Sequence, residues 1–297
     1  MATFDVPEVD YTRYTNRQLA AVPLAVLAVA LVILVAWWTL TGSPVALGID
    51  FTGGTELTVE TTTPRAEVGA AFDRQPESIQ GVGTEAGRYI VTFQSDSGTA
   101  DAGALRDQAA SNLQAPPGGG DIVVASQETS PTFGAGAQET ALVGLVAAFL
   151  GMSALAFILF RTFVPSVAIV VSAFSDIVIP LAVMNLVGIK LSLGTVAALL
   201  MLVGYSVDSD ILLNNHILRR SGGFYESTTR AMRTGVTMTI TSLSAMAVMA
   251  LTATLFGIDL LASIGIVLVL GLAADLMNTY MLNLSLLRWY KFEGVAR

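Results

Sequence analysis

The sequence has no cysteine, a single histidine and only two lysines among its 297 residues. Without cysteine, disulfides, thiol chemistry and cysteine-based metal sites are excluded. One histidine leaves little room for a zinc site or a Ser-His-Asp triad. The sequence also lacks a G-x-x-x-x-G-K-[ST] stretch, so the chain carries no P-loop of its own. We therefore expect no enzyme, no cofactor and no metal.

Charged residues are scarce as well, at 13% of the chain, whereas 53% of the residues are hydrophobic. This composition excludes a disordered protein or an ordinary soluble one and indicates a polytopic α-helical membrane protein. Six apolar runs are long enough to cross a bilayer as helices: residues 19–40, 141–160, 165–187, 193–213, 236–256 and 260–287.

Basic residues gather in alternate loops between these runs. One side holds Arg13, Arg17, Arg161, Arg219, Arg220, Arg230, Arg233, Arg288, Lys291 and Arg297, and the other side holds only Lys190 and Asp259 in its short loops. Basic loops stay in the cytoplasm. The pattern therefore predicts a multi-pass protein of the cell membrane with both termini cytoplasmic.

Residues 42–137 form the only sizeable polar segment, which the same topology places outside the cytoplasm. We expect strands at 55–61, 78–82, 88–93 and 121–126, and helices at 63–72 and 101–113. The order β-α-β-β-α-β predicts a small ferredoxin-like α/β domain. The expected organisation is thus 1–41 for the cytoplasmic start and first span, 42–137 for this domain, 138–289 for the five-helix remainder and 290–297 for a cytoplasmic tail.

The net charge of −8 lies entirely in this polar segment, where twelve acids face four arginines. An acidic, solvated surface is one interpretation. The other is a salt-loving host, in which surface carboxylates replace lysine. The second interpretation predicts that native structure is lost below molar salt, which unfolding measurements across a salt series would check.

Four acids fall inside the predicted spans: Asp176, Asp208, Asp210 and Asp275. Each such acid costs about 2.5–3.5 kcal/mol on insertion scales. At about 100° per residue, Asp208 and Asp210 point to nearly opposite faces of one helix. Asp210 aligns with Ser206 and Asn214, and Asp208 shares its face with Gly204 and Tyr205. A narrow bundle core accepts one of the two acids, and the other needs a second helix or a second subunit. The acids are neutral groups hydrogen-bonded between helices, partners for another subunit, or members of a proton path.

The segment GIDFTGGT, from Gly48 to Thr55, resembles the signature of the SecF family of protein-export membrane proteins. Further matching stretches are SPTFG before the second span, Asp176 in the third, GYSVDSD in the fourth and Thr241 to Leu243 in the fifth. The resemblance marks Gly48, Asp50, Gly53 and Gly54 as motif or hinge residues. It implies a heterodimer with a SecD-type subunit in the resistance-nodulation-division superfamily. Such a pair assists the Sec translocation channel in exporting polypeptides, driven by the proton gradient.

Three positions depart from the bacterial pattern of this family and resemble an archaeal version. Ser209 stands at the usual acid position, while Asp208 aligns with the acid typical of SecD. The expected arginine falls near Thr237, and Ser175 replaces the usual histidine before Asp176. If the subunit couples to an ion, Asp208 is the expected carrier, with Asp210 and Asp176 as supporting acids.

Two other functions stay open at this point. The chain could be half of a small-molecule exporter of the same superfamily, or a structural subunit of the translocon that conducts nothing. Among partners we also expect membrane lipids and no nucleic acid. The basic cluster Arg219, Arg220, Arg230 and Arg233 either holds a partner or an anionic lipid, or only sets the topology.

Overall fold

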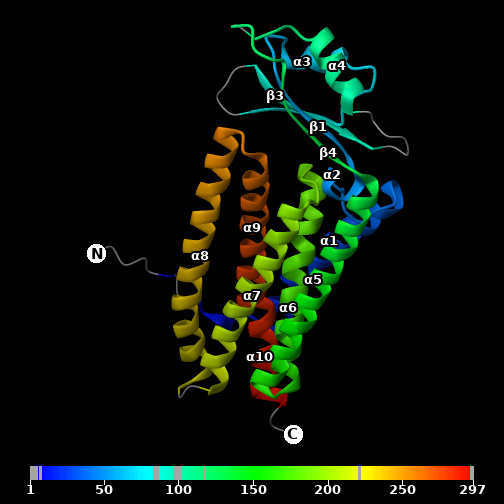
Figure 1. Cartoon of the computed structure of the whole chain (residues 1–297). Coiled ribbons are helices and arrows are strands. Elements are labelled where there is room, and N and C mark those ends of the chain that lie inside the picture. The colour runs from blue at the N-terminus through cyan, green and yellow to red at the C-terminus, as the bar shows by residue number, and fades with distance from the viewer. Residues whose placement is uncertain are drawn as a thin grey trace.

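The computed structural model describes residues 6, 9–82, 87–95, 102–116, 118–219 and 222–294. These residues form a bundle of long helices with a small sheet domain at one end (Figure 1). Within them, six spans are long and apolar enough to cross a membrane, which confirms the six predicted spans. The first five are α1 (Asn16–Thr41), α5 (Pro131–Phe160), α6 (Phe163–Val187), α7 (Leu193–Arg219) and α8 (Phe224–Phe256).

The last span is not one uniform helix. It joins α9 (Asp259–Met277), the π-helical segment η3 (Asn278–Asn283), α10 (Leu284–Trp289) and a second π-helical segment η4 (Tyr290–Gly294). Successive spans run in alternate directions. As a result, the start of α1, the turn from α5 to α6 and the end of the chain lie at the end of the bundle away from the sheet domain (Figure 1).

Two spans are much longer than their apolar runs. Helix α5 begins at Pro131, where the Ser130 Oγ accepts a hydrogen bond from the Phe133 N–H at 3.2 Å and caps the helix. Helix α8 begins at Phe224, twelve residues before its predicted apolar run. A hydropathy pattern marks only the part of a helix that faces hydrocarbon, so the helical ends beyond it were missed.

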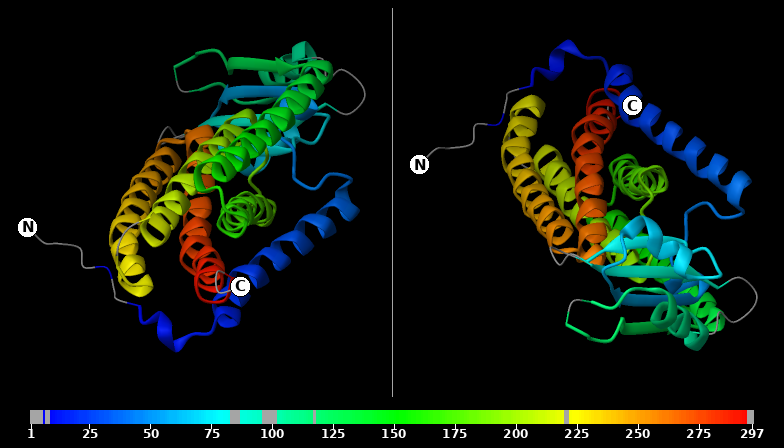
Figure 2. Two further views of the ribbon diagram at one scale, coloured as in Figure 1. Left: turned by 90° about the horizontal axis from the view of Figure 1, so that it is seen from below. Right: turned by 90° about the horizontal axis from the view of Figure 1, so that it is seen from above.

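Helices α6 and α7 are the most enclosed spans, while α5 and α8 are largely exposed to the surroundings of the chain. Seen along the bundle, α1 and α8 lie at opposite sides, with α6, α7 and α9 between them (Figure 2). Two glycines allow α9 to approach its neighbours. A Cβ at Gly271 would collide with Leu202 of α7, and one at Gly265 would lie about 3.0 Å from the backbone of Ala250 in α8.

The sheet domain has four described strands in the spatial order β2-β3-β1-β4, and all neighbours are antiparallel. The strands are β1 (Gly54–Glu60), β2 (Ser78–Gly81), β3 (Arg88–Gln94) and β4 (Val123–Thr129). Helices α3 (Arg65–Val68) and α4 (Ala102–Asn112) lie over one side of the sheet (Figure 1). The alternate residues Leu57, Val59, Val91 and Phe93 are fully buried, and Leu105 and Ala109 of α4 join them in one apolar core.

Some predicted boundaries in this domain were wrong. The helix expected over 63–72 is the short α3 followed by a 3-10 turn, η2 (Gly69–Ala71). The last strand runs over 123–129 rather than 121–126, because pairing with β1 fixes its register, with an irregularity between Thr58 and Val59. The predicted helix start at Asp101 lies outside the described residues.

Candidate functional site

Helix α7 carries its two carboxylates on opposite faces, as its periodicity predicts. Asp210 is fully buried in the bundle, whereas Asp208 is exposed on the outer surface of this chain. Ser206 and Asn214 share the buried face with Asp210. The structure therefore separates Asp208 from the acids that lie inside the bundle.

Asp176 from α6 and Asp275 from α9 join Asp210 in the core, each with 1% of its surface exposed. Both carboxylate oxygens of Asp176 are hydrogen-bonded. Its Oδ1 accepts from the Asn278 Nδ2 and its Oδ2 from the Ser206 Oγ, each at 2.6 Å. Asp176 thus ties α6 to α7 and to η3.

The other two acids, Asp210 and Asp275, contact three polar side chains and share one of them. The Asp210 Oδ1 accepts from the Asn283 Nδ2 at 2.7 Å and from the Thr279 Oγ1 at 3.0 Å. The Asp275 Oδ1 accepts from the Ser209 Oγ at 2.7 Å and lies 3.3 Å from the Thr279 Oγ1. Thr279 therefore lies between Asp210 and Asp275 and contacts both.

The hydroxyl protons are too few for these contacts. Ser209 has one hydroxyl proton but lies within hydrogen-bond distance of the Ser206 carbonyl, Asp275 and Thr279. Thr279 also has one, and both Asp210 and Asp275 are within its reach. A hydroxyl donates once and accepts twice. Ser209 and Thr279 therefore cannot donate to all of these acceptors at once.

Within the described residues, none of the intramembrane acids forms an ion pair with lysine or arginine. The same residues contain no group of three or more acidic or histidine side chains placed to hold a metal ion. Buried charge without a partner is strongly unfavourable. Among the described residues, these acids are therefore held by hydroxyl and amide donors rather than by a cation.

The π-helical segment η3 supplies three of the donors to these acids, from Asn278, Thr279 and Asn283. Single π-helical turns inside α-helices are frequent at functional sites. Thr279 and Asn283 were not found from the sequence. Polar side chains five residues apart within an apolar span were the available signal.

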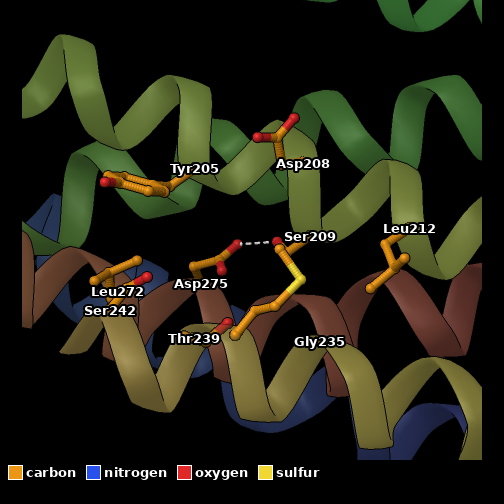
Figure 3. A pocket seen from close by; sticks show the side chains of 10 residues that line it. Tyr205, Asp208, Ser209, Leu212, Gly235, Thr239, Ser242, Leu272 and Asp275 are labelled. Carbon is orange, nitrogen blue, oxygen red and sulfur yellow. Dashed lines mark hydrogen bonds between the residues drawn. The ribbon is translucent and has the colours of Figure 1, made fainter. Parts of the chain in front are cut away.

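A cavity of about 100 Å³ opens between α7, α8 and α9 on the outer side of the acid cluster. Asp208, Ser209 and Asp275 line it, together with Gly235 and Met238. In Figure 3 the Asp275 carboxylate points to Ser209, while Asp208 is directed away from both. Asp208 forms no hydrogen bond or ion pair with a described residue. Asp275 thus belongs both to the buried cluster and to the cavity.

The glycine motif lies where the sheet domain meets the bundle. The Asp50 Oδ2 accepts a hydrogen bond from the Leu193 N–H, the first residue of α7, at 3.0 Å. The Gly48 N–H donates to the Leu191 carbonyl at 2.8 Å, and the Leu191 N–H donates to the Ala46 carbonyl at 2.7 Å. The motif therefore holds the beginning of the helix that carries Asp208 and Asp210.

Gly53 and Gly54 have positive φ angles of 77° and 155°, as their glycine pair predicts. They border α2 (Ile49–Thr52) and begin β1. A Cβ at Gly53 would lie 2.7 Å from the Pro131 nitrogen, and one at Gly54 would collide with the Phe93 carbonyl oxygen. This junction is closely packed against α5 and β3. The hinge role of the two glycines stays a prediction.

The family described as protein-export membrane protein SecD/SecF, C-terminal, matches residues 119–293, and the SecD/SecF GG motif matches residues 38–64. Protein-export membrane protein SecF of Haloferax volcanii is 66% identical over the whole of both chains, and that of Haloquadratum walsbyi is 64% identical. Both sources are halophilic archaea.

Among solved structures, SecDF from Thermus thermophilus, a translocon-associated membrane protein, is similar with a TM-score of 0.69 and 22% identity. The match covers 96% of this chain but only 39% of the SecDF chain. At this identity the likeness shows the fold alone. The sequence relatives carry the assignment: the chain belongs to the SecD/SecF family of protein-export membrane proteins, as a SecF-type accessory subunit of the Sec machinery.

Proposed function

We propose that this subunit works as a heterodimer with a SecD-type chain, which packs on the outer face of α7 and α8 around Asp208. The observation that carries the proposal is the exposed Asp208, which no described residue pairs with and which would otherwise face lipid. Met201, Tyr205 and Met238 are exposed on the same side. The SecDF match leaves most of that longer chain outside the aligned part, which is consistent with a second half.

Bulky substitutions on two exposed faces test this docking. We expect Met238→Trp to abolish co-purification with the SecD-type chain, because Met238 lines the cavity beside α7. Val32→Trp, on the exposed side of α1, should leave co-purification unchanged. Equal recovery of the partner with both variants would place the interface elsewhere. Removing the SecD gene should also lower the amount of this chain in the membrane.

The sheet domain lies outside the cytoplasm in our proposal and has a ferredoxin-like topology. The basic side chains Arg161, Arg219, Arg288 and Lys291 at the opposite end of the bundle support this orientation. The strand order β2-β3-β1-β4 in a β-α-β-β-α-β chain supports the topology. Because the chain lacks cysteine, single cysteines are clean probes. Ala66→Cys should react with an impermeant maleimide on intact cells, and Glu293→Cys only after permeabilisation.

We further propose that Asp208, Asp210, Asp176 and Asp275 couple export to the proton gradient, with Asp208 taking up the proton from the partner interface. The shared hydroxyl protons of Ser209 and Thr279 support a path that passes through Asp275. The full set of hydrogen bonds to Asp176 favours the alternative of a non-conducting structural subunit. Proton flux through the complex in vesicles, with and without Asp208→Asn plus Asp210→Asn, separates the two. Unchanged flux favours the structural subunit.

The edge strand β4 is our proposed contact for an emerging polypeptide beside the translocation channel. Val124, Ala125, Gln127 and Glu128 are exposed, so one edge of the sheet is open to strand addition, which tolerates many sequences. A photo-crosslinker at Val124 should capture a stalled export substrate, whereas one at the exposed Ala66 of α3 should not. Crosslinks to SecD alone would make the domain a spacer.

A further inference from the structure

A cleft of about 350 Å³ lies at the end of the bundle opposite the sheet domain. It is bounded by the turn between α5 and α6, the end of α7 and the segment η4. The residues that line it are Phe160, Thr162, Leu218, Arg219, Tyr290 and Lys291. The acid cluster and the proposed SecD interface use none of these residues.

Two cationic side chains share this cleft without an acidic partner. Arg219 donates to the Leu159 carbonyl at 2.5 Å and lies over the Phe160 ring at 5.7 Å. Lys291 lies 3.5 Å from the Ile217 carbonyl. Neither pairs with a carboxylate of the described residues. A guanidinium has five N–H donors and an ammonium has three, so most donors stay available to a ligand.

The beginning of α6 adds unsatisfied polar groups at the same place. Its N-cap residue is Thr162, whose side chain makes no capping hydrogen bond. The buried Thr162 Oγ1 has no hydrogen-bond partner among the described residues. The N-terminus of a helix carries partial positive charge and attracts anions. The cleft therefore combines two cations, a free hydroxyl and a helix N-terminus, all of which suit an anionic oxygen ligand.

Apolar side chains flank the cleft on the outer surface of the bundle. Ile158 is 69% exposed and Phe163 is 74% exposed, on either side of the turn that forms one wall. A ligand with an anionic head and apolar chains fits both surroundings, since basic pockets between membrane helices on the cytoplasmic side bind anionic lipid headgroups. We infer that the cleft binds the phosphate of an anionic phospholipid of the cytoplasmic leaflet. The choice of leaflet rests on the orientation proposed above.

The two cations of the cleft differ in exposure and pairing from basic residues that only set the topology. Arg13, at the same end of the bundle, is 79% exposed and forms an ion pair with Asp10 at 3.0 Å. At 1 M salt the Debye length falls to about 3 Å, which removes the general attraction of a basic surface for anionic lipid. Direct contacts inside the cleft persist under these conditions. Lipid preference in molar salt is thus the property that identifies the site.

Tryptophan quenching measures this preference directly. Trp289 immediately precedes the cleft residues Tyr290 and Lys291, and Trp37 and Trp38 at the other end of the bundle are the remaining tryptophans. Trp37→Phe with Trp38→Phe leaves Trp289 as the single reporter in the full-length chain. In 2 M salt we expect brominated phosphatidylglycerol to quench it at a lower mole fraction than brominated phosphatidylcholine. For comparison, at low salt each basic side chain near the surface contributes about a fivefold preference for anionic over neutral lipid.

In this background, Arg219→Gln with Lys291→Gln should reduce the preference to none, and Arg13→Gln should keep it. Arg219→Lys should keep part of it. If the double variant does not fold, as judged by altered quenching with phosphatidylcholine, Lys291→Gln alone should give a several-fold reduction. An unchanged preference in these variants, or equal quenching by both lipids in the parent, overturns the inference. Loss of the preference on adding inorganic phosphate would identify a site for free anions.

Neither SecD nor a proton gradient is present in this measurement. A negative result therefore leaves the export role intact, and a failed export role leaves the lipid result intact. Labelling at Glu293→Cys checks the leaflet separately.

Discussion

The two faces of α7 give the same chemical group, an aspartate carboxylate, opposite surroundings. On the inner face Asp210 is fully buried and accepts hydrogen bonds from Asn283 and Thr279. Two residues earlier, on the outer face, Asp208 is exposed and bonds to no described residue. The two residues are close in the sequence, so the difference in their burial and hydrogen bonding comes from the helices that pack against each face.

The comparison shows two ways in which a carboxylate within a membrane span can obtain polar partners. On the inner side the donors come from this chain itself, because α7 and the π-helical segment η3 bring hydroxyl and amide groups to the three buried acids. On the outer side no described residue bonds to Asp208, and we propose that the SecD-type chain supplies the missing group. An inner acid is thus expected to matter for stability, and the outer acid for assembly and transport.

The sharpest test of the outer face uses export itself. Asp208→Asn should abolish export that depends on the proton gradient while the variant stays bound to the SecD-type chain, because an amide keeps the size but does not release a proton. Asp210→Asn should do less, since its amide oxygen can still accept from Asn283 and Thr279. Export rates in vesicles with and without a gradient check both. Normal gradient-dependent export by both assembled variants would make the acids structural.

The inner face is tested by stability. Asp176→Leu removes the acceptor of Asn278 and of Ser206 and leaves two buried donors unpaired, at about 1–3 kcal/mol each. We expect the variant to lose about 2–6 kcal/mol, measured as the free energy of unfolding in mild detergent. The matched control Asp208→Leu should change the isolated chain by no more than about 0.5 kcal/mol. Equal losses would mean that the two faces do not differ.

These residues show which features of the site could be predicted from the sequence. Helical periodicity alone separated Asp208 from Asp210, and hydropathy predicted all six spans, because both depend on local spacing. Thr279 and Asn283 escaped prediction, since a π-helical turn changes the angle per residue and their targets lie on other helices. The glycine pair predicted positive φ, but not that Asp50 holds the first residue of α7. Contacts between segments 143 residues apart are set by packing.

The closely packed glycine junction gives a smaller effect at the start of α7. Gly54→Ala introduces a Cβ that collides with the Phe93 carbonyl, so we expect a loss of about 1–3 kcal/mol. Gly119→Ala is the matched control. Its φ of 74° is also positive, but nothing lies within 4 Å of the added Cβ, so only about 1 kcal/mol of backbone strain is expected. Thermal unfolding compares them. Similar losses would show that the junction is not crowded.

The smallest expected effect extends the comparison to the sheet domain, where Glu56 is a partly buried carboxyl. Burial raises the pKa of Glu56 in β1, and the nearby Asp50 and Asp259 carboxylates raise it further. The folded state then disfavours the charged form, so Glu56 costs stability as pH rises above its unfolded pKa of about 4.3. Glu56→Gln should therefore raise the melting temperature slightly at pH 8 and leave it unchanged at pH 4. The control substitution Glu67→Gln, at an exposed position, should not change the melting temperature at either pH.

Molar salt separates the two causes of the shift. It should remove the part of the stability gain that comes from Asp50 and Asp259, because their repulsion acts through solvent, and leave the part that comes from burial. A gain of equal size at both pH values would contradict this account and point to packing rather than charge.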